Sequence, residues 1–363
     1  MDRRKFLQST AAVSSGTALS AMSVPAIAKS RKELQIVSAW PRDLPGLGIS
    51  AQRLAARIEE LSQGQIQTHY FAAGERVGAF DVFDEVASGK AQAYIAAEYY
   101  WKGKHPAFSF FTSVPFGMTT IEWNAWIKYK GGQDLWDELS GKFDLKALPC
   151  GSTGTQMGGW FNKTVRSSDD FKGLKIRMPG LGGDVISKLG ATSVTLPGGQ
   201  IYENLLSGAI DATEWAGPYN DYFLKFYEAT KYYYYPGFHE PGGGVSIGFN
   251  ASWWSSLSKY EQALITAACM EENSAQYQEA QAKNGEYLIK LINEHGVKLR
   301  EFSEDIYDSL GEASAAVFEE TRQHSPLAAR VTNAFMQTLR EVGSWQKIAE
   351  ISFSNQRNRV LGL

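Results

Sequence analysis

Two short apolar runs in this chain each end in a charged residue. A turn-forming residue follows soon after each of them. One run places the guanidinium of Arg177 before Met178-Pro179, and the other places the carboxylate of Glu214 shortly before Gly217-Pro218. The planar guanidinium of arginine can hold a small carboxylate through two parallel hydrogen bonds. A glutamate in the same cleft would repel that anion unless a cation lay between them. The pattern therefore predicts an electrically neutral site made of Arg177, an anion, a cation and Glu214.

Alternating strand and helix patterns in the first part of the chain predict an open α/β lobe. Apolar residues at helical spacing, such as Leu54, Ile58 and Leu61, indicate a helix that Gly64 ends. The expected strands cover 34–40, 66–71 and 91–97, and the expected helices cover 48–61 and 81–88.

The second part of the chain repeats this alternation and predicts a second lobe. Strands are expected within 171–178 and at 193–196, and helices are expected at 184–189 and 201–207. The segments 86–93 and 205–212 share one pattern, a helix end, a Ser-Gly cap and a strand. Since ligands collect beyond the carboxyl ends of strands in such sheets, both segments direct the residues that follow them, Tyr100 and Glu214 among them, at a cleft.

A capping box at Ser258-Lys259-Tyr260-Glu261 opens a long helical pattern that continues to His295. Asn284-Gly285 could kink or split this helix. If it is unbroken, it is longer than one lobe and either braces both lobes or carries a dimer contact. Further helices are expected towards the C-terminus, at 304–323, 327–342 and 344–356.

Residues 1–28 have the features of a signal peptide. A basic start with Arg3 and Arg4 precedes an apolar run of small residues and the cleavage pattern Ala26-Ile27-Ala28, so we expect the mature chain to begin near Lys29 in the periplasm. The arginine pair fits either a twin-arginine leader, which would mean export in the folded state, or an ordinary basic start.

The remaining composition excludes several classes of protein. After the leader the sequence contains no run of 18 or more apolar residues, which is the length that a membrane-spanning helix needs. The whole chain carries a net charge of −3 and the leader a net +2, which leaves −5 for the mature chain and argues against nucleic acid as a partner. Cys150 and Cys269 could form one disulfide or remain buried thiols. The five histidines lack zinc-ligand spacing.

Several motifs together resemble the solute-binding proteins of tripartite ATP-independent periplasmic (TRAP) transporters, over nearly all of the mature chain. The motifs of the family are the segments 169–177 (DDFKGLKIR) and 201–211 (IYENLLSGAID). Three further segments are similar to the subgroup that binds 2-oxo and 2-hydroxy monocarboxylates with a metal cation, namely 153–161 (TGTQMGGWF), 212–218 (ATEWAGP) and 232–237 (YYYYPG).

The resemblance implies a two-lobed periplasmic binding protein fold of the α/β class, with a long bracing helix and extra C-terminal helices. Lobe I would comprise 29–152, approximately 241–257 and C-terminal segments, and lobe II would comprise 153–240. The long helix would cover 258–295 and the C-terminal helical region 296–363. Relatives in the subgroup form dimers through a swapped C-terminal helix, so a homodimer is implied as well.

The resemblance also implies roles for individual residues. Arg177 would hold the carboxylate of the ligand, and Tyr100 would lie beside it. Glu214 and Gln156 would bind the cation through side-chain oxygens, and Trp215 through its backbone carbonyl. Glu240 would be a hydrogen-bonding neighbour. Oxygen ligands suit Na⁺ or Ca²⁺, and the low count of charged ligands favours Na⁺.

The function implied is a periplasmic protein that binds a small 2-oxo monocarboxylate such as pyruvate and delivers it to a membrane permease. The alternatives are a secreted enzyme acting on a carboxylate, with Glu214 and Glu240 as an acid–base pair, and a binding protein for another importer class or for another ligand such as lactate. The sequence contains no nucleophile elbow, no HExxH and no dinucleotide-binding glycine pattern, which argues against the enzyme.

Overall fold

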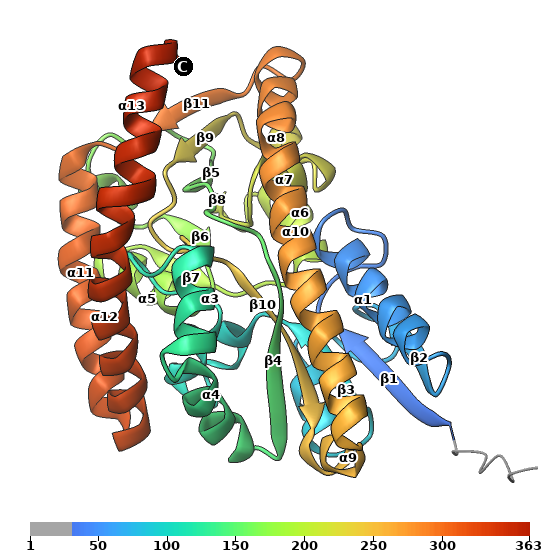
Figure 1. The fold of residues 1–363 in the computed structure, drawn as a ribbon. Coiled ribbons are helices and arrows are strands. Elements are labelled where there is room, and N and C mark those ends of the chain that lie inside the picture. The colour runs from blue at the N-terminus through green and yellow to red at the C-terminus, as the bar shows by residue number, and fades with distance from the viewer. Residues whose placement is uncertain (1–30) are drawn as a thin grey trace, which may run out of the picture. The chain divides into compact units, whose positions relative to one another are not determined.

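The computed structural model describes residues 31–363, and the predicted signal peptide at 1–28 lies outside the described residues. Two β-sheets organise the described part of the chain (Figure 1). The first, sheet A, has the strand order β2-β1-β3-β10-β4. Its strands are β1 (Lys32–Ser38), β2 (Ile66–Phe71), β3 (Ala93–Ala96), β4 (Leu145–Ser152) and β10 (Gly244–Asn250). β1, β2 and β3 are parallel, and β10 runs antiparallel to both of its neighbours.

The second sheet, sheet B, has the strand order β11-β9-β5-β8-β6-β7. Its strands are β5 (Gly159–Phe161), β6 (Lys175–Arg177), β7 (Thr192–Val194), β8 (Ala212–Thr213), β9 (Tyr232–Tyr235) and β11 (Lys298–Glu301). The three strands β8, β6 and β7 are parallel, and Arg177 pairs with Thr213. Because of this register, Arg177 and Glu214 leave neighbouring strands at the same edge of the sheet.

Helices pack around both sheets, and the expected elements of the two halves are confirmed with shifts of a few residues at their ends. The helices of the first half are α1 (Leu47–Leu61), α2 (Val82–Ala87), α3 (Thr120–Tyr129) and α4 (Gly132–Gly141), with the 3₁₀ turns η1 (Glu98–Trp101) and η2 (Pro106–Phe111). The next helices are α5 (Gly180–Lys188), α6 (Gly198–Leu206), α7 (Pro218–Phe223), α8 (Phe226–Ala229) and α9 (Ala251–Ser256), with the 3₁₀ turn η3 (Ser168–Phe171).

Two short crossovers carry the chain between the sheets. Residues 153–158 connect β4 to β5, and residues 236–243 connect β9 to β10. The crossovers are hydrogen-bonded to each other: the Gln156 amide donates to the Glu240 carbonyl at 3.0 Å, and the Thr153 amide donates to the Gly243 carbonyl at 3.0 Å. These bonds hold the side chains of Gln156 and Glu240 close together between the sheets.

The long helix α10 (Lys259–Asn293) is unbroken through Asn284-Gly285 and packs on β4, α1 and α7 (Figure 1). Glu279 of α10 accepts hydrogen bonds from Arg53 of α1 at 3.2 Å and from the Tyr219 hydroxyl of α7 at 3.0 Å. The Asn284 side chain is not a break, because its oxygen accepts a hydrogen bond from the Tyr219 amide at 3.0 Å. The helix therefore braces elements beside both sheets, which is one of the two roles that we expected.

The C-terminal region differs from the sequence-based expectation at one point. α11 (Glu304–His324) and α12 (Pro326–Gln346) pack against each other, as predicted. The expected break at Gly343 is wrong, because α12 continues through it into the π-helical turn η4 (Lys347–Ile351) and α13 (Ser352–Leu361). A single glycine costs a helix only about 1 kcal/mol, which its neighbours can offset. Cys150 and Cys269 are buried free thiols.

Candidate ligand- and cation-binding site

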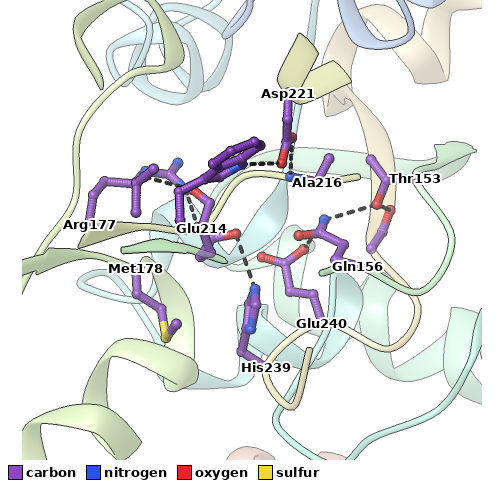
Figure 2. Close-up of polar contacts among 12 residues, drawn as sticks. Thr153, Gln156, Arg177, Met178, Glu214, Ala216, Asp221, His239 and Glu240 are labelled. Atoms are coloured by element: carbon purple, nitrogen blue, oxygen red, sulfur yellow. Dashed lines mark hydrogen bonds and ion pairs between the residues drawn. The ribbon is translucent and has the colours of Figure 1, made fainter. Parts of the chain in front are cut away.

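Arg177 and Glu214 lie against each other at the edge of sheet B, and both side chains are 0 % exposed (Figure 2). The Nη1 atom of Arg177 donates to the Glu214 carboxylate and, at 3.2 Å, to the Glu214 carbonyl, while its Nε donates to the Leu196 carbonyl at 3.2 Å. The ring of Trp215 covers the guanidinium, with Cζ 5.0 Å from the ring centre. Only Nη2 of this guanidinium has no protein partner.

The electrostatics of the pair favour the charged form of Arg177. Burial is the largest single influence and lowers the pKa of this guanidinium, but the electrostatic influences of Glu214, Tyr100, Tyr99 and Glu240 together outweigh it, so the net shift is upward. A buried ion pair of this kind is costly to break, since either partner alone would leave an uncompensated charge.

A second carboxylate and a histidine adjoin Glu214 from the 236–243 crossover. Ligand atoms of Glu214, His239 and Glu240 lie within 4.8 Å of one another, and all three residues are buried. Nε2 of His239 donates to the second carboxylate oxygen of Glu214 at 3.2 Å. His239 can come this close because Gly182 of α5 packs on it, where a Cβ atom would lie 2.8 Å from the His239 Cβ.

Gln156 and Glu240 present buried oxygen atoms that no protein donor satisfies. The side-chain nitrogen of Gln156 donates to Thr153 at 2.9 Å and to Oε2 of Glu240 at 2.8 Å. The Oε1 atoms of Gln156 and of Glu240 are both buried without a hydrogen-bond partner. Buried oxygens without donors beside a carboxylate are the ligands that Na⁺ and Ca²⁺ prefer, so the residues present fit an oxygen-coordinated cation.

Glu240 is held in an environment that opposes its charge. Burial, and then the negative charge of Glu214, raise the pKa of Glu240 well above its ordinary value. A bound cation would act in the opposite direction, because it stabilises the ionised carboxylate.

A small cavity of about 20 Å³ adjoins these oxygens, which is room for about one water molecule. Its walls combine apolar and aromatic side chains with two of the polar groups. The lining residues are Trp40, Leu47, Ala97, Tyr99, Tyr100, Thr112, Thr153, Gln156, Trp215, Glu240, Gly243, Gly244 and Val245. No lysine or arginine is among them, so the cavity wall offers nothing to balance a second ligand carboxylate.

The structure brings the six predicted site residues to one region. Arg177 and Glu214 face the crossovers, Gln156 and Glu240 lie on the crossovers, and Tyr100 and Trp215 line the cavity between them. In Figure 2 the side chains of Arg177, Glu214, Gln156 and Glu240 converge.

Sequence reasoning missed two buried residues of this region, His239 and Asp221. His239 was considered only for zinc-ligand spacing, although its position directly before Glu240 was a usable signal. Asp221 accepts hydrogen bonds from Trp160 Nε1 at 2.8 Å, from the Tyr233 hydroxyl at 2.7 Å and from the Ala216 amide at 3.2 Å. Trp160 is 61 residues from Asp221 in sequence, and the fold brings the two together.

Comparison with known proteins identifies the family. Residues 38–324 match the model of the DctP family, described as bacterial extracellular solute-binding protein, family 7. The chain is 36 % identical over 360 residues to the monocarboxylate 2-oxoacid-binding periplasmic protein of Nostoc sp., a match that covers 98 % of each chain.

Solved structures of TRAP solute-binding proteins share the whole fold. One from Bordetella bronchiseptica, a mixed-occupancy dimer with copurified calcium and picolinate, is 32 % identical with a TM-score of 0.89, covering 92 % of this chain and 98 % of that one. One from Pseudoalteromonas atlantica, with bound sodium and pyruvate, is 32 % identical with a TM-score of 0.87, covering 90 % of this chain and 99 % of that one.

These matches confirm the two-lobed α/β fold and the periplasmic location that the sequence predicted. In the described residues no helix is both long and apolar enough to cross a bilayer. The chain belongs to the bacterial extracellular solute-binding protein family 7, the DctP family of TRAP transporter solute-binding proteins.

Proposed function

We propose that this protein binds a small 2-oxo monocarboxylate such as pyruvate, together with a cation, between its two lobes and delivers it to the membrane permease of a TRAP transporter. The observation that carries the proposal is the meeting of Arg177, Glu214, Gln156 and Glu240 in one buried region, with Nη2 of Arg177 and two Oε1 atoms left without protein partners. The named ligands of the similar proteins, 2-oxoacids in one and pyruvate with sodium in another, support it.

Arg177 would hold the ligand carboxylate, beginning at Nη2. A grip through two parallel hydrogen bonds also needs Nη1, which now donates to Glu214. Ligand binding therefore requires the Glu214 carboxylate to leave Nη1, and a cation between the ligand and Glu214 supplies the positive charge that this carboxylate would lose.

The cation would be bound by Oε1 of Gln156, the carboxylate of Glu214 and the carbonyl oxygen of Trp215, with Glu240 as a further oxygen ligand. Burial favours the neutral form of Glu240, which leaves Glu214, the partner of Arg177, as the charged ligand. One carboxylate suits Na⁺, whereas Ca²⁺ would need Glu240 in its ionised form as well. We therefore propose Na⁺, with Ca²⁺ as the alternative.

The 2-oxo substituent would enter the cavity beside Tyr100 and Trp215. The apolar wall of the cavity includes Leu47, Ala97 and Val245. The cavity lining contains no cationic group that could pair with a second carboxylate of the ligand. A monocarboxylate with a short uncharged chain fits this wall better than a dicarboxylate does.

We propose the predicted lobe boundaries, 29–152 with 241–257 for lobe I and 153–240 for lobe II. The strands of sheet A all fall in lobe I, and β5 to β9 of sheet B fall in lobe II. The strand β11, from the C-terminal region, adds to the edge of sheet B. The two hydrogen-bonded crossovers would then act as the hinge.

A homodimer is part of the proposal. The turn η4 and helix α13 have no buried residue and expose several large apolar side chains. These are Ile348, Ile351, Phe353, Val360 and Leu361, each more than half exposed. Such a helix is expected to pack on a second copy, since exposed apolar patches mark interaction sites. The similar protein from Bordetella bronchiseptica is a dimer.

The alternative of a secreted enzyme has little to support it in the site. Both carboxylate oxygens of Glu214 are already engaged, by Arg177 and by His239, so neither is free to take a proton from a ligand. Incubation with labelled 2-oxo acids would produce no product under this proposal.

Calorimetric titration of the ligand-stripped mature protein tests the proposed function. Pyruvate is titrated into protein in buffers that contain Na⁺, Ca²⁺ or only a large organic cation, and succinate serves as the dicarboxylate control. We expect tight pyruvate binding that disappears with the organic cation, and no succinate binding. Equal pyruvate binding in all three buffers, or turnover of the ligand, would contradict the proposal.

A further inference from the structure

Asp221 is a buried carboxylate that does not line the cavity and contacts none of the proposed cation ligands through its own side chain. It belongs to α7 and is 1 % exposed. Its Oδ2 accepts hydrogen bonds from Trp160 and Tyr233, and its Oδ1 accepts one from the backbone amide of Ala216 at 3.2 Å. Two donors therefore fix the orientation of the carboxylate. Its other oxygen, Oδ1, accepts the hydrogen bond from the backbone amide next to Trp215.

The hydrogen bond to Ala216 fixes the direction of the Trp215 carbonyl. The peptide bond between Trp215 and Ala216 is trans, since Tyr235-Pro236 is the cis bond of the described chain. In a trans peptide the N–H of one residue and the carbonyl of the residue before it point in opposite directions. With its N–H directed to Asp221, this peptide directs the Trp215 oxygen away from Asp221. Figure 2 shows Asp221 on one side of Ala216 and Gln156 and Glu240 on the other.

Several neighbouring backbone groups of this segment have partners within the protein. The Glu214 amide donates to the Arg177 carbonyl at 3.1 Å, and the Glu214 carbonyl accepts from the Thr213 hydroxyl at 2.8 Å. The Ala216 carbonyl accepts from the Met157 amide at 3.0 Å. Within residues 31–363 the Trp215 carbonyl accepts no hydrogen bond, although the residue is only 5 % exposed. A buried carbonyl needs a partner, and a cation beside Gln156 and Glu240 would be one.

We propose that Asp221 is a positioning residue that aims the Trp215 carbonyl oxygen at the cation. This inference rests on the proposed function, in which that oxygen is a cation ligand. A residue that only packs would not have this role. Asp221 would orient one peptide group and would thereby determine whether the Trp215 carbonyl is among the ligands of the ion.

Terbium luminescence tests the role, with Tb³⁺ as a stand-in for Ca²⁺ that the nearby tryptophans can excite. Emission lifetimes of the Tb³⁺ and pyruvate complex in H₂O and in D₂O count the water molecules on the ion. The variant is Asp221→Asn, whose amide cannot satisfy both Trp160 and Ala216. The matched control is Tyr233→Phe, which removes one donor to Oδ2 and leaves the bond between Oδ1 and Ala216 intact.

We expect one additional water on the ion in Asp221→Asn and about tenfold weaker Tb³⁺ binding, which is typical when a group that orients a metal ligand is lost. Tyr233→Phe should keep the wild-type water count. An unchanged count in a folded Asp221→Asn protein would overturn the inference even if the affinity fell, because the lost negative charge alone can weaken binding.

If Asp221→Asn does not fold, Asp221→Ser is measured in its place, since its shorter side chain cannot reach Ala216 while it holds Trp160. The failure of the inference is distinct from that of the proposed function. Wild-type protein that binds neither ion nor pyruvate would contradict the proposed function, whereas wild-type binding with equal water counts in all variants contradicts only the role of Asp221.

Discussion

The guanidinium of Arg177 and the carboxylate of Glu214 form an ion pair that is completely shielded from solvent. The two residues are neighbours because Arg177 ends β6 and pairs with Thr213, the residue before Glu214. The desolvation cost of such a pair can exceed the attraction between its charges, so a buried ion pair is weak evidence of a stabilising role and is consistent with the proposed binding role.

Arg177→Met should abolish pyruvate binding and lower the free energy of unfolding by about 3–5 kcal/mol, because Glu214 is left buried without a counter-charge. The double variant Arg177→Met/Glu214→Leu should recover most of this stability and still fail to bind. Urea unfolding and calorimetry measure the two effects separately. Arg330→Met, which breaks an exposed pair with Glu138, is the matched control and should change neither by much. Pyruvate binding by the double variant would refute the assignment of Arg177.

His239→Leu should weaken cation binding about tenfold, because the donor that orients the second carboxylate oxygen of Glu214 is lost. His239→Gln keeps a donor of similar reach and should retain more of the affinity than His239→Leu does. Titration of Ca²⁺ at a fixed pyruvate concentration measures both. If the two variants were equally weak, His239 would act in some way other than through this hydrogen bond.

Glu98 should make stability depend on pH, independently of the binding site. Its carboxyl is buried and accepts hydrogen bonds from Tyr94 and Ser246, and burial raises the pKa of Glu98 to about 7. Folding raises the pKa of this acid, so the folded protein favours its neutral form. The contribution of Glu98 to stability is therefore complete when the pH is below the pKa of Glu98 in the unfolded chain, and it is lost as the pH rises towards 7. The loss attributable to Glu98 is about 3 kcal/mol between pH 4.5 and pH 7.

Thermal unfolding of wild type and Glu98→Gln over this pH range checks that prediction. Asp221 also titrates near pH 7, so the difference between the two proteins is the relevant quantity. The variant should gain stability relative to wild type as the pH rises. A difference that does not change with pH would show that Glu98 is charged in the fold.

Removal of residues 347–363 should convert the proposed dimer to a monomer and leave ligand affinity unchanged, because η4 and α13 contain no buried residue. Light scattering at several concentrations and calorimetry measure the two properties. The matched control is Ile348→Lys/Phe353→Lys, which keeps the helix and should also give a monomer. Full-length protein that is already monomeric would contradict the proposed dimer.

The sequence predicted the strands and helices around 32–97 and 171–207, and it predicted that Arg177 and Glu214 lie near each other, because parallel strands meet at one edge of a sheet. It did not predict the elements between 98 and 152, among them α3, α4 and β4. It did not indicate that these two side chains contact each other, since that depends on the register of β6 and β8. It left the long helix open to a break at Asn284, because the contact of this residue with Tyr219 is 65 positions away in sequence.

Asp221 shows most clearly what sequence patterns lack. Its partners Trp160, Tyr233 and Ala216 come from two strands and a loop, and none has a fixed spacing from it. The bond from Trp160, 61 positions away in sequence, follows from tertiary packing, and only the bond from Ala216, five positions away, is local. The family resemblance named the proposed cation ligands, and the structure added His239 and Asp221, which form hydrogen bonds beside them.

The most direct test of the central claim, that anion and cation bind together between Arg177 and Glu214, is the dependence of pyruvate affinity on Na⁺ concentration. If one Na⁺ binds with each pyruvate, the logarithm of the dissociation constant should fall with the logarithm of the Na⁺ concentration at a slope near −1, because coupled binding is reciprocal. Choline chloride keeps the ionic strength constant, and Ca²⁺ is tested in the same way. A slope near zero for both ions, with pyruvate still bound tightly, would contradict the account.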